Sequence, residues 1–123
     1  MNCDQPTPEE LSRIYHALRA SRRRRTIELL WANGGREMEV RTVARKISSL
    51  EHDVDIRTSN EEYRNVYNAL SQTHLETLDD AEIIEYESDR QKVSSGPYLT
   101  TAALFIALNR ATIQTLHYDP FVR

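Results

Sequence analysis

Residues 59–86 show the clearest periodic pattern of hydrophobic and polar positions in the chain. Up to residue 81 the hydrophobic positions recur at helical spacing, which predicts one long helix with a single buried face. The hydrophobic positions of this helix are Tyr63, Val66, Tyr67, Leu70, Leu75, Leu78 and Ala81. Residues 83–87 change to a β-rich pattern, so the helix should end just before a short strand.

The opposite face of the same predicted helix is polar and carries several amide side chains. Its outward positions are Arg64, Asn65, Asn68, Gln72 and Thr73. Side chains of these types hydrogen-bond to base edges and phosphates in protein–DNA interfaces. This face is therefore a candidate DNA-binding surface.

Four further helices and two further strands are predicted around this helix. A Thr N-cap, followed by Pro and by Glu at the third position, begins an N-terminal helix over residues 7–20. Ser21 should cap a second helix over residues 22–33, which two glycines end. The other expected elements are a short strand at 37–40, a helix at 41–50, a returning strand at 92–95 and a last helix at 100–116.

This order of elements predicts a mainly α-helical domain with a small β-hairpin wing. The fold class is a winged helix-turn-helix with additional N- and C-terminal dimerisation helices. Within a single domain, residues 1–6 should form a flexible tail, residues 22–99 the winged-helix core and residues 100–116 the dimerisation helix. The helix at 41–50 and the helix at 59–81 would be the two helices of the helix-turn-helix.

The last predicted helix is hydrophobic on nearly every side in its first half. Such a helix needs more than one packing surface, so we predict a two-fold homodimer through it, with the N-terminal helix taking part. The expected interface residues are Leu11, Ile14, Tyr15, Ala102, Phe105, Ile106, Asn109 and Ile113. Two alternatives remain: the reverse assignment, in which Leu104 and Leu108 face the partner, and a plain core helix.

Composition and charge limit the class of protein. The chain has 123 residues, which favours one domain, and its single cysteine excludes an intramolecular disulfide. No hydrophobic run reaches the roughly 18 to 20 residues that span a bilayer, and no signal-peptide pattern is present, so we expect a soluble cytoplasmic protein. Fourteen arginines and two lysines stand against 19 acidic residues, a composition associated with halophilic cells.

The net charge of −3 counts against a nucleic-acid partner, because no overall basic field is present. The charge is uneven, however, with +4 on residues 1–46 and −7 on residues 47–123. Double-stranded DNA is the expected partner, and the candidate contacts are Arg41, Arg45, Lys46, Asn60, Arg64, Asn65, Asn68, Gln72, Thr73, Arg90 and Lys92. A second hypothesis is that cations taken up between DNA and carboxylates weaken the salt dependence of binding, with Asp79, Asp80, Glu85 and Glu87 as candidates.

The four arginines at 22–25 stand at the start of a predicted helix, where they oppose its dipole. Two interpretations remain open. The arginines contact phosphates, or they form a solvated face paired with Glu9, Glu10 and Glu28.

A family resemblance becomes specific in residues 63–86. The segments Tyr63-Arg64-Asn65-Val66-Tyr67, Gln72-Thr73-His74-Leu75, Leu78-Asp79-Asp80-Ala81 and Ile83-Ile84-Glu85-Tyr86 resemble the recognition helix and first wing strand of haloarchaeal winged-helix transcription regulators. The similarity covers about residues 10–100, includes regulators of the oxidative-stress response, and extends more distantly to ArsR and PadR repressors. It implies a dimeric DNA-binding regulator without enzyme activity. Glu82 stands where the family usually has Gly, and Glu76 where it commonly has Pro.

Other chemistry has weaker support in the sequence. His74 on the inner side of the long helix is expected to be a hydrogen-bonded, half-buried histidine. The acidic residues 51–55 lack the glycine and terminal Glu of a calcium loop, so no metal site is predicted. No cofactor is expected other than loosely bound potassium, sodium or chloride ions. The alternative function is a winged-helix module that binds another protein and not DNA.

Overall fold

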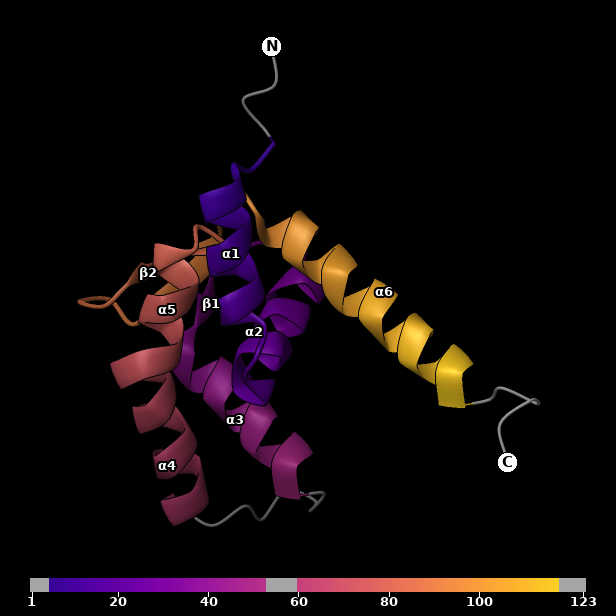
Figure 1. The fold of residues 1–123 in the computed structure, drawn as a ribbon. Helices are drawn as coiled ribbons and strands as arrows, with labels where there is room; N and C mark the ends of the chain where they lie inside the picture. Colours follow the sequence, from indigo (N-terminus) through magenta and orange to yellow (C-terminus); the bar gives the residue numbers. More distant parts are fainter. Residues whose placement is uncertain (1–4, 53–59, 118–123) are drawn as a thin grey trace.

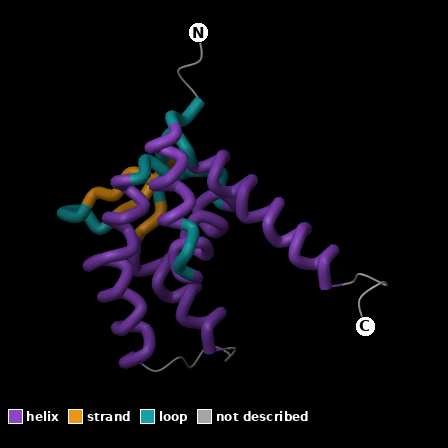
Figure 2. The backbone as a smooth tube through the Cα atoms, in the orientation of Figure 1, coloured by secondary structure: helices purple, strands orange, loops and turns teal. Residues whose placement is uncertain are grey.

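The computed structural model describes the backbone of residues 5–52 and 60–117, and side chains up to residue 111. The described part is mainly helical and contains one small antiparallel sheet of three strands (Figures 1 and 2). In chain order the elements are α1 (Pro8–Ala17), α2 (Ser21–Ala32), β1 (Met38–Glu39), α3 (Val40–His52), α4 (Asn60–Ala69), the π-helical turn η1 (Leu70–His74), α5 (Leu75–Asp80), β2 (Ile84–Glu87), β3 (Lys92–Ser95) and α6 (Leu99–His117).

The sheet joins two distant parts of the chain. β3 lies in the middle, with β2 on one side and β1 on the other, and all neighbours are antiparallel. The hairpin between β2 and β3 is local, whereas β1 reaches it from before α3. The pairing of Glu39 with Lys92, and of Lys92 with Glu87, puts these three side chains on one face of the sheet.

The predicted order of helices and strands is confirmed for the described residues, with several corrected boundaries. The Thr7 capping box is present, because the Thr7 hydroxyl accepts from the Glu10 amide and the Glu10 carboxylate accepts from the Thr7 amide. Ser21 is not the cap of the second helix but its first residue, and no side chain caps that helix. Glu51 and His52 extend α3 beyond its predicted end at residue 50. Ser59, the predicted first residue of the long helix, lies outside the described residues.

The long helix predicted from residue 59 to residue 81 is continuous from α4 to α5 but is not a regular α-helix. In the π-helical turn η1 the Leu75 amide donates to the Leu70 carbonyl, five residues earlier. The inner face is as predicted, because Val66, Leu70 and Leu78 are fully buried among the residues of the core. Tyr63 and Tyr67 are partly buried against the same cluster.

The chain turns sharply between α5 and β2 at Glu82, whose φ is 61°. A left-handed residue here is usually glycine, because a side chain makes this conformation costly. Gly96 lies directly against the turn, since a Cβ at this position would come 2.7 Å from the Glu82 carbonyl oxygen. The Tyr98 amide donates to the same oxygen at 2.9 Å. The turn is therefore fixed by the backbone that follows β3, and it sets the direction of the hairpin.

The expected dimer face needs correction at three positions. Ile14, Ala102 and Ile106 are buried in the chain's own core, so they cannot lie on an outer face. Leu104 and Leu108 are instead 56% and 63% exposed, which is the reverse assignment of the α6 faces.

The remaining residues of the expected dimer face differ in exposure. Tyr15 is 54% exposed and contacts Phe105, with 5.2 Å between ring centroids. Leu11 and Phe105 are half-buried, Asn109 is exposed, and the side chain of Ile113 lies outside the described residues.

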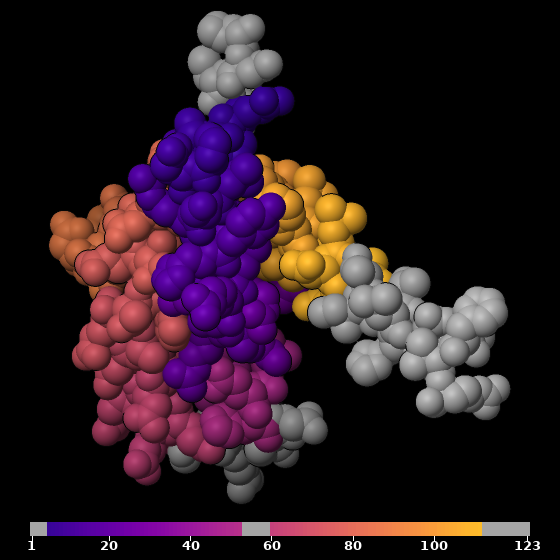
Figure 3. Space-filling view, viewed as in Figure 1, coloured from indigo at the N-terminus to yellow at the C-terminus, as the bar shows by residue number. Residues whose placement is uncertain are grey.

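The helix α6 leaves the rest of the fold as it continues towards its C-terminal end (Figure 1). In the space-filling view, α1 and α2 cover the middle of the molecule, between the α4–α5 side and α6 (Figure 3). The surface of α4 and the surface of α6 are therefore separate parts of the molecule.

Candidate nucleic-acid interface

The outer face of α4 and η1 carries the polar residues singled out from the sequence. Val66 and Leu70 on the inner side are buried. The candidate contacts on this segment are all exposed, namely Asn60, Arg64, Asn65, Asn68, Gln72 and Thr73. The structure thus brings six predicted site residues together on the solvent side of one helical segment.

The π-helical turn changes the expected geometry at the end of this face. Gln72 and Thr73 lie within η1, so their direction differs from that of a regular α-helix continued from Asn68. On the inner side of the same turn, His74 Nδ1 is 3.3 Å from Nη1 of Arg23, a buried arginine of α2. Burial lowers the pKa of the His74 imidazole, and the charge of Arg23 lowers it further. The neutral ring can accept the arginine's hydrogen bond.

The arginine run at the start of α2 is used to hold the fold together. Arg22 makes two hydrogen bonds to the Glu51 carboxylate, at 2.6 and 2.9 Å. Arg23 Nε donates to the Ala17 carbonyl at 2.8 Å, and Arg24 Nη1 donates to the Leu18 carbonyl at 2.6 Å. Arginines are favourable there because these carbonyls form the negative end of α1. The prediction that these arginines pair with Glu9, Glu10 and Glu28 is wrong.

Glu28, one of those expected partners, instead pairs with Arg110 of α6 at 2.7 Å. For Arg23 and Arg24, the cost of a cation at the start of α2 is offset by hydrogen bonds to the carbonyl end of α1.

The cations of α3 lie beside α4. Arg41, Arg45 and Lys46 are exposed, as predicted. The Arg45 guanidinium carbon is 4.8 Å from the centre of the Tyr63 ring, a cation–π contact that joins α3 to α4. The same three cations line an open groove of about 680 Å³ that also contains Leu29 and Leu50.

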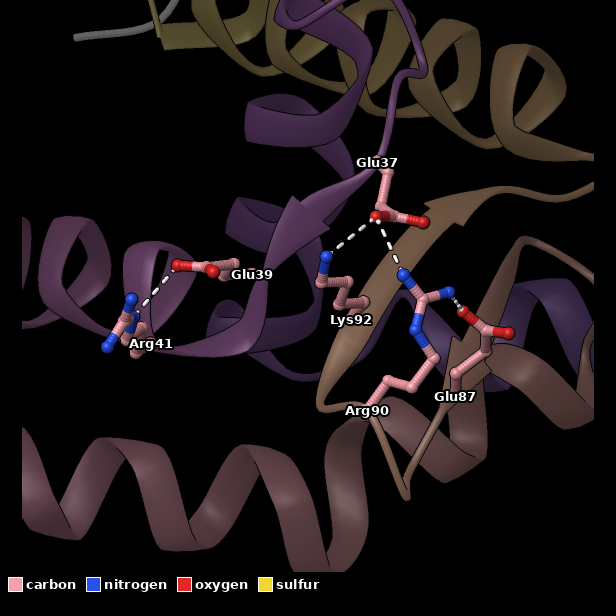
Figure 4. Close-up of polar contacts among 6 residues, drawn as sticks. All are labelled: Glu37, Glu39, Arg41, Glu87, Arg90 and Lys92. Carbon is pink, nitrogen blue, oxygen red and sulfur yellow. Dashed lines mark hydrogen bonds and ion pairs between the residues drawn. The ribbon is translucent and has the colours of Figure 1, made fainter.

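The hairpin cations Arg90 and Lys92 are both held by carboxylates (Figure 4). Glu37, just before β1, places Oε2 3.1 Å from Lys92 Nζ and 3.5 Å from Arg90 Nη2. Arg90 Nη1 also donates to Glu87 Oε1 at 2.7 Å. A carboxylate from a distant part of the chain is therefore shared by both candidate contacts of the hairpin.

A similar pair holds Arg41 at the start of α3. Its Nε donates to Glu39 Oε1 at 2.8 Å, and this hydrogen bond lowers the pKa of the Glu39 carboxyl group. Figure 4 shows Arg41, Lys92 and Arg90 each next to a glutamate. Three cations and three carboxylates alternate here, so this part of the candidate surface has no net charge. Sequence spacing gave no sign of the pairing, which depends on the register between β1 and β3.

Gln91 is a structural residue that sequence reasoning missed. Its side-chain Oε1 accepts from Tyr67 Oη at 2.7 Å and from Ser71 Oγ at 3.0 Å. Its Nε2 donates to Tyr86 Oη at 2.8 Å and to the Ser88 carbonyl at 2.7 Å. All four hydrogen-bonding positions of the amide are occupied. Gln91 therefore fixes the hairpin against the helical segment that carries the polar face.

The carboxylates proposed to take up cations are not equivalent. Asp79 is half-buried and its Oδ2 accepts from the Tyr86 amide at 2.8 Å, so this residue stabilises the start of the hairpin. Asp80, Glu85 and Glu87 are exposed. Across the described residues no group of three or more His, Cys, Asp or Glu side chains could hold a metal ion. Residues 53–55 of the acidic segment lie outside that range.

These features define a mainly helical domain whose small sheet holds a charged hairpin beside an exposed polar helix. The chain belongs to the DUF7344 family, described as a domain of unknown function, and the family model matches residues 15–94. Neither the curated proteins nor the solved structures contain a match to this chain. In the part of the chain that the structure describes, every helix is too short or too polar to cross a membrane.

Proposed function

We propose that this protein is a sequence-specific DNA-binding transcription regulator that acts as a homodimer in a high-salt archaeal cytoplasm. The observation that carries the proposal is the outer surface of α4 and η1, where six polar side chains are exposed along one helical segment. Arg45 of α3 contacts Tyr63 of α4, and Gln91 joins the hairpin that carries Arg90 and Lys92 to the same helical segment. Polar side chains that read bases, flanked by cations that contact phosphates, are the usual composition of a DNA-binding surface.

The proposed architecture is a winged helix-turn-helix. In it, α3 is the first helix, the segment from α4 to α5 is the recognition helix, and β2 with β3 forms the wing. The sheet supports this interpretation, because β1 pairs with β3 and so brings the start of α3 next to the hairpin. Gln91 supports it as well, since its hydrogen bonds join the proposed wing to the proposed recognition helix.

In the proposed complex, the two copies of the recognition helix enter successive major grooves, about 34 Å apart. Arg64, Asn65, Asn68, Gln72 and Thr73 contact bases and phosphates. Arg41, Arg45 and Lys46 fix the register on the backbone, while Arg90 and Lys92 contact phosphates or the minor groove. We propose that the dimer forms through the exposed leucines of α6, Leu104 and Leu108, with Tyr15 nearby.

The test is a selection of DNA fragments bound by the purified full chain from genomic DNA in molar potassium chloride. The proposal predicts enrichment of one sequence motif with two related half-sites. Gln72→Ala should bind the same fragments with relaxed preference at one position of each half-site, by about 1–3 kcal/mol. Recovery of random fragments, or of none, would refute a sequence-specific regulator.

A second candidate function is a winged-helix module that binds another protein. The groove beside α3 favours it, because Leu29 and the 53%-exposed Leu50 share this surface with three cations. Such a groove suits an acidic segment with apolar side chains. The variant Leu50→Gln distinguishes the two candidate functions. It should abolish binding of a protein partner but leave the enriched DNA motif unchanged.

A further inference from the structure

We propose that Glu37 restrains the cations of the hairpin and thereby suppresses binding to non-specific DNA, an inference that rests on the proposed function. Glu37 belongs to no predicted contact surface. Its carboxylate nevertheless holds both Arg90 and Lys92 through one oxygen, Oε2. The restraint makes Glu37 a positioning residue that acts through these two cations.

The backbone holds Glu37 in this place. β1 is only two residues long, and Glu39 within it lies opposite Lys92 of β3. Residues two apart on an extended chain point to the same side, so Glu37 faces the same side of the sheet as Glu39 and Lys92. Met38, between them, lies opposite Val93 and packs against the core. The contact of Glu37 with the hairpin therefore follows from the register of the sheet.

The exposure of the ion pairs allows phosphate to compete for the cations. The side chains of Arg90 and Glu37 are about half exposed, at 51% and 45%, and Lys92 is 29% exposed. Exposed ion pairs are weak and are screened by salt. A DNA phosphate can therefore replace the carboxylate on either cation. The displaced Glu37 then stays close to the phosphate, where it repels DNA or retains a solvent cation.

This competition changes the dependence of binding on salt. Each phosphate neutralised by a free cation contributes about −0.9 to the slope of log Kobs against log salt concentration. A cation that must first leave a carboxylate releases fewer counterions overall. Arg90 and Lys92 together should therefore contribute less to the salt slope than two free cations would. Non-specific binding depends almost wholly on this electrostatic term, whereas specific binding also has base contacts. Glu37 should therefore weaken non-specific binding more than specific binding.

The experiment compares Glu37→Gln with Glu9→Gln in the full chain. Glu9 is exposed on α1, outside the proposed DNA contacts, and makes no ion pair with any described residue. The two substitutions therefore change the net charge equally, but only Glu37→Gln removes a partner of Arg90 and Lys92. Lys92 is then freed, while Arg90 keeps its ion pair with Glu87. Fluorescence anisotropy with a random-sequence duplex of about 30 base pairs, long enough for two half-sites, gives Kobs from low to molar potassium chloride.

Glu37→Gln should steepen the negative salt slope by up to about 1 and tighten low-salt binding of the random duplex up to about tenfold. Glu9→Gln should keep the wild-type slope. Equal slopes for Glu37→Gln and Glu9→Gln would overturn the inference while leaving the proposed function intact. If the wild-type protein binds neither this duplex nor selected fragments at any salt concentration, the proposed function fails and the inference fails with it.

Glu37→Asp keeps the net charge but shortens the side chain, which moves the carboxylate away from Lys92. It should shift the salt slope in the same direction as Glu37→Gln and by a smaller amount. This variant tests the contact if Glu37→Gln does not fold. If Glu37→Gln does not fold, and the folded Glu37→Asp variant has the same salt slope as the wild-type protein, the inference is wrong.

Discussion

Gln91 determines how the hairpin is held against the α4–η1 segment. Its side chain joins Tyr67 and Ser71 of that segment to Tyr86 and Ser88 of the hairpin. Its backbone also contributes, because the Gln91 carbonyl accepts from the Val40 amide at the start of α3 at 3.0 Å. One residue in a turn thus joins three elements, including the two that the proposed function brings to DNA.

Replacing Gln91 by Ala should therefore destabilise the fold. We expect the free energy of unfolding to fall by about 2–3 kcal/mol, since several partly buried polar groups lose their partners together. Chemical denaturation monitored by circular dichroism measures this change. Gln72→Ala is the matched control, because Gln72 is exposed and should change stability by less than about 0.5 kcal/mol. Equal stability of the two variants would contradict the role assigned to Gln91.

Several residue positions were predictable because local pattern decides them. The buried face of the long helix, the Thr7 capping box and the two glycines with positive φ after α2 follow from spacing and backbone preference. The ion pairs of Glu37 and the hydrogen bonds of Gln91 were not predictable in this way. They depend on which strands pair and in which register, and a single sequence does not specify that long-range pairing.

At the scale of elements, the junction of α1, α2 and η1 is built around a buried cation. Arg23 donates to the end of α1 and also lies next to His74 in the π-helical turn. Nothing in the local sequence distinguishes this turn from a regular helix, so the pattern predicted an uninterrupted α-helix. The wider turn places His74 against Arg23 while Ser71 still reaches Gln91.

The lowered pKa of His74 predicts how this junction responds to pH. Above about pH 6.5, the ordinary histidine pKa, the ring is neutral in both the folded and the unfolded chain, so its contribution to stability is complete. As the pH falls below that value, the unfolded chain binds the proton first, and the free energy of unfolding decreases until the lowered folded pKa is passed. His74→Gln should remove this part of the pH dependence.

Urea denaturation at a series of pH values between about 8 and 5 measures the effect, because that range spans the ordinary histidine pKa. Gln72→Ala, in the same turn, should keep the wild-type dependence on pH. If His74→Gln also keeps it, the titration of His74 does not control the stability of the junction.

At the scale of the whole molecule, the exposed hydrophobic side of α6 is the feature that predicts assembly. Leu104 and Leu108 are among the most exposed large hydrophobic residues described. The sequence predicted a two-sided α6 but could not decide which side the domain buries. Packing against the core decided it, since Ala102 and Ile106 turn inward.

We expect the double substitution Leu104→Gln and Leu108→Gln to convert a dimer into a folded monomer, because it removes the apolar side chains from the proposed interface without touching the core. Sedimentation equilibrium measures the mass. Leu50→Gln removes a leucine of similar exposure from α3 and should leave the dimer intact. A wild-type monomer, or a double variant that still sedimented as a dimer, would show that α6 does not join two copies.

The most direct test of the central claim is a dimethyl sulfate footprint of the selected DNA, because this reagent methylates guanine N7 in the major groove. Two copies of the α4–η1 face should protect guanines in two successive major grooves, centred about 10–10.5 base pairs apart. Arg64→Ala should lose protection at one guanine of each half-site and keep the rest, because arginine is the usual partner of guanine O6 and N7. Protection confined to one groove, or none while the fragment stays bound, would contradict a DNA-reading surface on this helix.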